Sequence, residues 1–316
     1  MMNGQPPPSI TVGTRFIASG DSSPEMVQKS LLGSVIGRQG DSSPKMVQKS
    51  LLGSVIGQQG DSSPDAINRV PTLNRAIHVP KNITAPVEIR DLKKSFVLKP
   101  VLRGINLDVR QGECVALLGA NGTGKTTLLR IMAGLTKPGT GTVSIAGFDS
   151  VRDAQQVRGL IGLVAHQPYL YEELTALENL LFFARMYAVK HAQERAHSLL
   201  QRVGLERRMR ERVNTFSRGQ VQRLAWARAL LHSPRVLLLD EPDTGLDQQG
   251  HELIDALLNE HTLQGGCTLF TTHQLERALR LADRVVILSA GRIVFERETT
   301  KLDPDTLQNI YQRITQ

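Results

Sequence analysis

The sequence predicts an α/β fold in which a parallel sheet is covered on both faces and carries a small antiparallel β subdomain and a helical insert. A glycine-rich loop at residues 119–127 lies between an apolar strand pattern and a helical pattern. After the loop, apolar strand patterns alternate with helical patterns, which is typical of a parallel sheet. The chain is helical in pattern between Tyr169 and His232, which predicts an insert at about residues 168–232.

The glycine-rich loop has the complete pattern G-x-x-x-x-G-K-[ST], which predicts the core of a P-loop NTPase. Glycines let backbone N–H groups turn towards a phosphate, and the N-terminus of the following helix adds positive potential. Lys125 is expected to reach the outer phosphates of ATP, and Thr126 to supply a hydroxyl ligand to Mg²⁺. The predicted nucleotide-binding residues of the loop are Gly119, Asn121, Gly122, Thr123, Gly124, Lys125, Thr126 and Thr127.

Composition bounds the possible classes of protein. The chain has 316 residues, of which 40% are hydrophobic, enough for one large core or two modest ones. No apolar stretch reaches the roughly 18 to 20 residues that cross a bilayer, and the chain does not start like a signal peptide.

Cys114 and Cys267 each open an apolar strand pattern, so we expect buried thiols in a reducing, cytosolic compartment. The net charge of +8 is scattered and aromatic residues make up only 4%, so no nucleic-acid partner is expected.

The first 84 residues contain a tandem repeat. Residues 20–39 recur almost unchanged at 40–59, and a third copy starts at Gly60. Two copies and a fragment are too few for a solenoid, which needs about three or more units. We expect residues 1–84 to be a low-complexity extension and linker, produced by recent duplication or by a misplaced start codon. A short helix with a weak membrane or partner contact is the alternative.

The strand patterns begin at Val87. Strands are expected at residues 87–90, 101–109 and 114–118, with a turn at Gln111-Gly112, and they form the small antiparallel sheet and the strand before the phosphate loop. Later strands are expected at residues 236–239, 268–271 and 285–288, with a helix at 253–263 among the segments between them. The nucleotide-binding domain is expected to span residues 85–298, followed by a tail at 299–316.

Two adjacent acids follow the apolar run that ends at Leu239. An α/β sheet presents its ligand groups at the carboxyl ends of its strands, where Asp240 and Glu241 stand. Asp240 is expected to hold Mg²⁺, through water, and Glu241 to orient and deprotonate the water that attacks the γ-phosphate.

Further segments follow in an order and spacing that resemble the ATP-binding subunits of ABC transporters, over about residues 85–298. Ala165-His166-Gln167 resembles the family's Q-loop, residues 215–220 (TFSRGQ) its signature, and residues 244–247 (TGLD) its D-loop. His273 follows an apolar strand and resembles the switch histidine, and Phe96 stands where the family places an aromatic ring against adenine. The resemblance implies an ABC ATPase fold.

The resemblance also implies roles for these residues. Gln167, Glu241 and His273 would be the catalytic residues, and Thr126, Gln167 and Asp240 would hold Mg²⁺. Ser217, Gly219 and Gln220 would contact the ATP bound by an opposite subunit. The signature departs from the usual leucine-serine-glycine-glycine-glutamine form at Phe216 and Arg218. A catalytically silent interaction subunit is therefore one alternative.

The resemblance further implies partners and a location. Two copies would form a homodimer around two ATP molecules and drive an integral-membrane permease from the cytoplasmic face of the inner or plasma membrane. Residues 168–189 are amphipathic and are expected to dock a permease helix, with a plain core helix as the alternative. A soluble ABC-type ATPase acting on ribosomes or DNA is a rival class, but the chain has one phosphate loop and no sustained heptads.

Two segments of the chain look most like exporter subunits. They are Leu-Thr-Ala-Leu-Glu-Asn-Leu at residues 174–180 and Phe-Ser-Arg-Gly-Gln at residues 216–220. The similarity includes the heme exporter of cytochrome c maturation, so we expect an export function, with heme among the candidate substrates.

Overall fold

The computed structural model describes residues 85–97 and 99–315. The predicted repeat extension at residues 1–84 lies outside the described residues.

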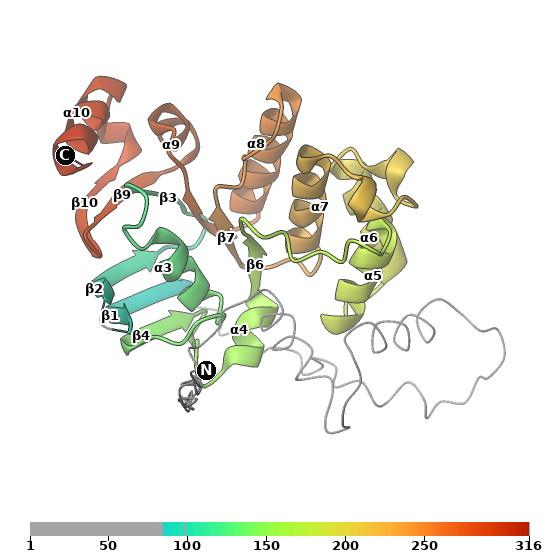
Figure 1. Ribbon diagram of the computed structural model, residues 1–316, viewed down its shortest axis with the longest axis horizontal. Coiled ribbons are helices and arrows are strands. Elements are labelled where there is room, and N and C mark those ends of the chain that lie inside the picture. Colours follow the sequence, from blue (N-terminus) through green and yellow to red (C-terminus); the bar gives the residue numbers. More distant parts are fainter. Residues whose placement is uncertain (1–84, 98, 316) are drawn as a thin grey trace, which may run out of the picture. The chain divides into compact units, whose positions relative to one another are not determined.

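The central sheet has six strands in the order β10-β9-β3-β8-β7-β6 (Figure 1). Their bounds are β3 Cys114–Leu118, β6 Ile161–Val164, β7 Val236–Asp240, β8 Cys267–Thr271, β9 Arg284–Ser289 and β10 Arg292–Glu298. Five neighbouring strands run parallel to one another: β9, β3, β8, β7 and β6. The sixth strand, β10, pairs with β9 in the antiparallel sense. The four apolar runs predicted as strands of this sheet agree with β3, β7, β8 and β9 to within one residue at each end. The predicted parallel core is confirmed.

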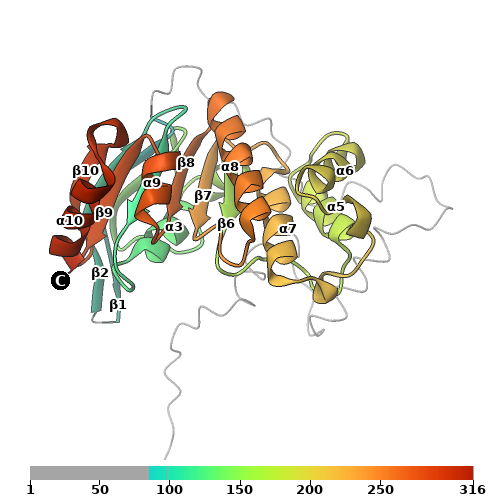
Figure 2. The same cartoon turned by 90° about the horizontal axis from the view of Figure 1, so that it is seen from above.

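Alternate residues of the central strands belong to different hydrophobic cores. In β3, Ala116 and Leu118 pack in one core with α7 (Arg218–Leu230), α8 (Gln248–Leu263) and α9 (Leu275–Leu281). Val115 and Leu117 pack in the other core with α3 (Lys125–Met132), α4 (Ala154–Leu160) and the small sheet. Successive side chains of a strand point to opposite faces of the sheet, which divides them between the two cores. The sheet is covered on both faces as predicted (Figure 2).

The small sheet has the order β2-β1-β4-β5 and is antiparallel throughout. Its strands are β1 Val87–Phe96, β2 Lys99–Val109, β4 Thr140–Ile145 and β5 Phe148–Asp149. The predicted antiparallel subdomain is therefore confirmed. The apolar pattern predicts neither β4 nor β5, because β4 buries only Val143 and Ile145 and β5 has two residues.

The predicted insert is helical and contains α5 (Ala176–Met186), α6 (Ala192–Arg202) and α7, with short 3₁₀ turns η2 (Glu206–Arg208) and η3 (Val213–Thr215). Thr175 caps α5: its hydroxyl accepts from the Glu178 amide at 3.2 Å, and Glu178 accepts from the Thr175 amide at 2.8 Å. The insert joins the core of the main sheet through fully buried leucines on all three helices: Leu180, Leu199 and Leu224.

After β10 the chain forms a 3₁₀ turn, η4 (Thr299–Lys301), and a helix, α10 (Pro304–Thr315). Leu307 of α10 is fully buried in the same core as α7, α8 and α9, so the segment expected as a tail carries a packed helix. None of the helices in the described part of the chain has the length and apolar character needed to cross a bilayer.

Both cysteines lie in interior strands, as expected. Cys114 in β3 and Cys267 in β8 are buried and form no disulfide. Burial raises the pKa of both thiols, that of Cys267 to about 12. Neither thiol is poised to react, because the thiolate is the reactive form.

Candidate functional site

The glycine-rich loop connects β3 to α3 and depends on three glycines with positive φ, Gly119 at 149°, Gly122 at 78° and Gly124 at 112°. A Cβ atom on Gly119 would lie 2.3 Å from the carbonyl oxygen of Leu288, and one on Gly124 would lie 2.8 Å from Leu102 Cδ2. Gly119 and Gly124 are therefore required both for the backbone conformation and for close packing.

Lys125 is the first residue of α3 and is only 7% exposed. Its ammonium donates to the carbonyl oxygens of Gly119 at 2.6 Å and Ala120 at 3.0 Å, so it lies on the inner side of the loop. Burial lowers the pKa of Lys125, and the nearby carboxylates of Glu241 and Asp240 act in the opposite direction. The loop and the two acids therefore meet at the carboxyl edge of the sheet.

Thr271 fixes the two acids. Asp240 ends β7 opposite Thr271 of β8, and the Thr271 hydroxyl donates to Asp240 Oδ1 at 2.9 Å. The same hydroxyl accepts from the Glu241 amide at 2.9 Å. Glu241 has a φ of 49°, a left-handed conformation that is uncommon outside glycine and clusters at functional sites. The sequence pattern does not reveal Thr271, because its role depends on the pairing of two strands.

The Glu241 carboxylate has a second partner in His273, whose Nε2 lies 2.8 Å from Glu241 Oε1. The side chains of His273 and Glu241 are 41% and 40% exposed, so a small molecule can reach both. The structure thus brings four predicted site residues to one edge: Lys125, Asp240, Glu241 and His273.

The loop after Glu241 is tied to α7. The carbonyl oxygen of Pro242 accepts from Gln222 Nε2 at 2.7 Å and from Trp226 Nε1 at 3.2 Å. Trp226 is fully buried, so this contact anchors the loop in the core. Neither α7 residue is predicted from the sequence, because each acts through a main-chain oxygen in a distant segment.

Ser217 is the N-cap of α7 and is exposed. Its hydroxyl accepts from the Gln220 amide at 3.3 Å, while its own amide donates to Gln220 Oε1 at 2.9 Å. Arg218 lies against the turn at Gly245, where a Cβ would be 3.0 Å from Arg218 Cγ. The two segments that resemble the signature and the D-loop therefore pack together within one chain.

Comparison with known proteins decides the family. The family model described as "ABC transporter" matches residues 102–244. The uncharacterized ABC transporter ATP-binding protein YdbJ of Bacillus subtilis (strain 168) is 39% identical over 227 residues, which cover 72% of this chain and 73% of the relative. The chain belongs to the ATP-binding proteins of ABC transporters. The Nod factor export ATP-binding protein I of Rhizobium meliloti (strain 1021) is 40% identical over 215 residues, 67% of this chain and 64% of the relative.

Solved structures confirm the ABC ATPase fold. The ATP-binding subunit of an ABC transporter superposes with a TM-score of 0.68 at 32% identity, covering 73% of this chain and 99% of the other. A dimeric ATP-binding cassette in a post-hydrolysis state, bound to ADP and Pi, gives a TM-score of 0.63 at 30% identity, covering 67% and 98%.

The other predicted site residues of this ABC ATP-binding protein include Gln167 and Phe96. Gln167 is exposed beyond β6. A cavity of about 210 Å³ is lined by its neighbours His166 and Pro168 together with Arg218 and Glu241. Phe96 ends β1 and is 47% exposed, with the Lys94 ammonium 5.1 Å from its ring centre. No hydrogen bond in the described part of the chain joins Phe96 or Ser217 to the phosphate loop.

The predicted magnesium ligands have suitable chemistry. Thr126 in the first turn of α3 offers a hydroxyl, Gln167 an amide oxygen, and Asp240 a carboxylate. Mg²⁺ prefers oxygen ligands and is usually held by one or two carboxylates together with substrate phosphates and water. Among residues 85–97 and 99–315, no cluster of three or more His, Cys, Asp or Glu could hold a metal ion by itself.

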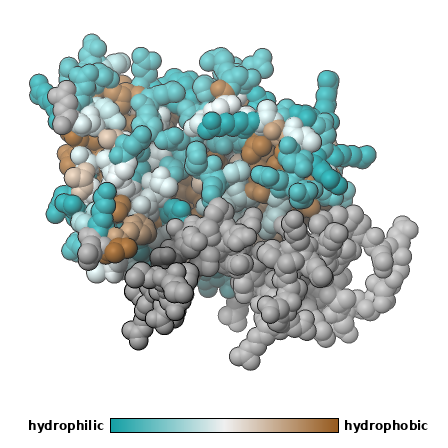
Figure 3. Space-filling model, in the orientation of Figure 1, coloured by the Kyte–Doolittle hydropathy of each residue, from teal (hydrophilic) through white to brown (hydrophobic). Residues whose placement is uncertain are grey.

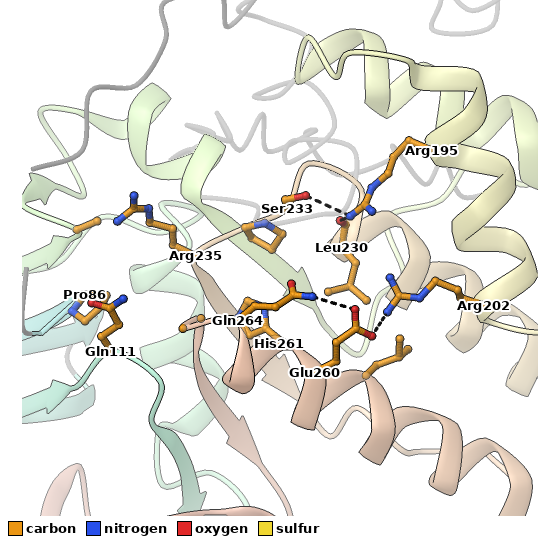
Figure 4. Close-up of a pocket in the computed structure, with 15 residues that line it drawn as sticks. Pro86, Gln111, Arg195, Arg202, Leu230, Ser233, Arg235, Glu260, His261 and Gln264 are labelled. Carbon is orange, nitrogen blue, oxygen red and sulfur yellow. Dashed lines mark hydrogen bonds and ion pairs between the residues drawn. The ribbon is translucent and has the colours of Figure 1, made fainter. Parts of the chain in front are cut away.

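A second cavity of about 340 Å³ lies at the opposite edge, where β7 and β8 begin (Figure 4). Two of its three arginines have protein partners: Arg195 donates to the carbonyl oxygen of Leu230 at the end of α7 at 3.0 Å, and Arg202 pairs with Glu260. Cations are favoured at helix C-termini, so these side chains stabilise the fold. No residue of the phosphate loop lines this cavity.

Proposed function

We propose that the chain is the ATP-hydrolysing subunit of an ABC exporter, which forms a homodimer around two ATP molecules and drives a separate permease. The observation that carries the proposal is the meeting of Lys125 with Asp240, Glu241 and His273 at one edge of the sheet. The direction of transport is supported by relatives whose names refer to Nod factor export.

In this proposal the chemistry follows from the positions of the charges. The loop amides and Lys125 bind the phosphates of ATP, which carry the charge that the buried ammonium complements. The Glu241 carboxylate accepts a proton from water as the water oxygen attacks the γ-phosphorus and the bond to the β,γ-bridging oxygen breaks. His273 orients Glu241 and contacts the γ-phosphate. The products are ADP and phosphate.

Thr126, Gln167 and Asp240 would hold Mg²⁺, which neutralises phosphate charge when bound. Among the described residues, Asp240 accepts a side-chain hydrogen bond only at Oδ1, from the Thr271 hydroxyl, so its other oxygen would be available for a water ligand. Phe96 would stack on adenine, since this residue is 47% exposed at the end of β1.

A second copy would complete each site. Ser217 and Gly219 lie at the N-terminus of α7, where free backbone N–H groups attract anions. With Gln220 they would contact the γ-phosphate held by the other protomer, so ATP joins the two copies. Hydrolysis removes that bridge and lets the dimer open.

Residues 168–189 would dock a cytoplasmic helix of the permease. Leu180 and Phe183 are buried, whereas Tyr171 and Phe182 are only partly buried and contact each other edge to face at 4.9 Å. The buried residues of α5 agree with the core alternative, and the partly exposed rings of Phe182 in α5 and of Tyr171 before it would contact the partner. Apolar patches lie among hydrophilic surface over the helical insert (Figure 3).

The subunit would sit peripherally at the cytoplasmic face of the inner or plasma membrane. Transport of heme stays a prediction from sequence resemblance, because the relatives named above point to other cargo or to none. The alternatives of a soluble ATPase on ribosomes or DNA and of a silent subunit remain outcomes of the test.

The test is co-expression of the full chain with the membrane protein encoded beside it, followed by purification and an ATPase assay with Mg²⁺. We expect a stable complex that hydrolyses ATP, lost in Lys125→Ala and retained in the control Lys137→Ala, an exposed residue. A complex without ATPase activity would identify a silent subunit. Stimulation by ribosomes or DNA, with no membrane protein bound, would favour the rival class.

A further inference from the structure

Among the strands that the structure describes, β6 lies at the edge of the six-stranded sheet and pairs only with β7. The outward carbonyl groups of an edge strand need partners when they are covered by protein. Ile161 and Leu163 are two residues apart, so their carbonyl groups point to the same side. The Ile161 oxygen is 3.0 Å from His232 Nε2, and the Leu163 oxygen accepts from Arg228 Nη2 at 2.5 Å. Side chains from α7 and the residues just after it therefore take the place of a further strand.

Arg228 is the less expected of these two partners. It is 8% exposed, and no carboxylate pairs with it in the part of the chain that the structure describes. Its Nε atom has no hydrogen-bond partner among residues 85–97 and 99–315. The guanidinium carbon lies 5.7 Å from the ring centre of Tyr169 and 5.5 Å from that of Phe183. Burial of an unpaired charge is costly, so an apolar residue would stabilise the fold better unless the charge has a use.

The contacts of Arg228 lie on both sides of Gln167 in the chain. Leu163 precedes Gln167 by four residues, and Tyr169 follows it by two. Tyr169 has a positive φ of 49°, so the chain turns at this residue, whose ring lies near the Arg228 guanidinium. Through Phe183, Arg228 also contacts α5 of the helical insert. Arg228 itself belongs to α7, whose N-cap is the signature residue Ser217.

We infer that Arg228 is a positioning residue that holds the loop of residues 164–168 against α7, so that movement of the signature helix moves Gln167. This inference rests on the magnesium-binding role proposed for Gln167. Arg228 would connect the signature segment at the start of α7, which would meet the second protomer, to Gln167, which would face the nucleotide. The link uses one side chain and needs no change in the sheet.

The test compares Arg228→Met and Arg228→Lys with the matched control Arg195→Met, all in the full chain. Arg195 also donates to main-chain oxygens at the end of α7, those of Leu230 and of the next residue Leu231, but no hydrogen bond joins it to β6 or to the Gln167 loop. Two quantities are measured: amide hydrogen exchange over residues 163–169, and the ratio of ATP affinity with Mg²⁺ to that with EDTA.

In Arg228→Met we expect exchange in that segment to become about tenfold faster, the effect of losing a hydrogen bond from a charged donor. We expect the affinity ratio to fall about tenfold, as for residues that support metal ligands. Arg228→Lys keeps a donor without the planar group that stacks on the rings, so its values should be intermediate. Arg195→Met should match the wild type in both.

A double substitution separates positioning from general destabilisation. If Arg228 acts through Gln167, the affinity ratio of Gln167→Ala with Arg228→Met should equal that of Gln167→Ala alone. Additive losses, or faster exchange spread evenly over the domain, would overturn the link. A wild-type ratio in Gln167→Ala would instead overturn the role proposed for Gln167, and the inference with it. If Arg228→Met fails to fold, Arg228→Lys supplies the same comparison.

Discussion

The Nε2 atom of His273 lies 2.8 Å from Oε1 of Glu241, and this hydrogen bond joins the segment after β8 to the residue after β7. Glu241 is also held from the other end, since its amide donates to the Thr271 hydroxyl at 2.9 Å. A left-handed backbone and two fixed contacts orient the carboxylate towards the solvent-accessible edge. Such preorganisation is what a general base requires.

Replacement of Glu241 by Gln should abolish hydrolysis while ATP binding is retained. The amide keeps the shape of the side chain but cannot accept a proton from water, so the turnover number should fall by about 10² to 10⁴. ATP then persists between two copies, and gel filtration with ATP should show a dimer. Glu252→Gln, on the exposed face of α8, is the control. Normal turnover in Glu241→Gln would remove Glu241 from its proposed role.

The sequence predicts those parts of the site that are contiguous in the chain. The phosphate loop carries its whole pattern in nine residues, and Asp240 and Glu241 follow a fully apolar strand, so local spacing is enough to find Lys125 and both acids. Thr271 lies 31 residues from Asp240, and only the register of β7 with β8 brings them together. Its role could not be read from spacing.

The same reason explains which elements of the fold are predictable. β3, β7 and β8 are short apolar runs buried on both faces, and their composition identifies them. β6 has only four residues and follows α4 without a break, so its pattern is lost in that of the helix. The partners of β6 in α7 are side chains, which no strand pattern predicts.

Gly119→Ala should destabilise the fold much more than Gly122→Ala. Both positions have positive φ, which costs a residue with a Cβ roughly 1–2 kcal/mol. At Gly122 a Cβ would meet no atom of the described residues within 4 Å, whereas at Gly119 it would lie 2.3 Å from the Leu288 oxygen. Overpacking should add about 1–3 kcal/mol at Gly119 alone. Urea unfolding measures both changes, and equal losses of stability would contradict the packing argument.

Arg277→Met should be strongly destabilising. Arg277 is 4% exposed and pairs with Asp243 at 3.3 Å and with Asp255 at 2.7 Å. Its loss leaves buried carboxylates short of a partner, at a cost of about 3–5 kcal/mol. Arg280→Met is the matched control, because Arg280 also contacts Asp255 but is 60% exposed, and exposed pairs contribute at most about 1 kcal/mol. Thermal unfolding of both variants gives the comparison, and a similar effect in each would refute it.

His232 should make the fold sensitive to acid. Burial lowers its pKa from 6.5 to about 4; the hydrogen bond to the Ile161 oxygen acts against this shift, and the charges of Arg228 and Arg195 add to it. The folded chain therefore favours neutral His232, stacked on Tyr187 at 4.0 Å. Since the unfolded chain binds the proton more readily, this contribution is complete above pH 6.5 and is lost as the pH falls towards 4.

The contribution of His232 amounts to about 3 kcal/mol over that range. His232→Gln keeps a donor for Ile161 but cannot be protonated, so its free energy of unfolding should fall less than that of the wild type between pH 7 and pH 4.5. Urea titrations at the two pH values measure the difference, and His197→Gln on the exposed side of α6 controls for loss of a histidine elsewhere. Because all other titrating groups are shared, an identical pH slope in His232→Gln and the wild type would show that His232 carries its proton in the folded protein.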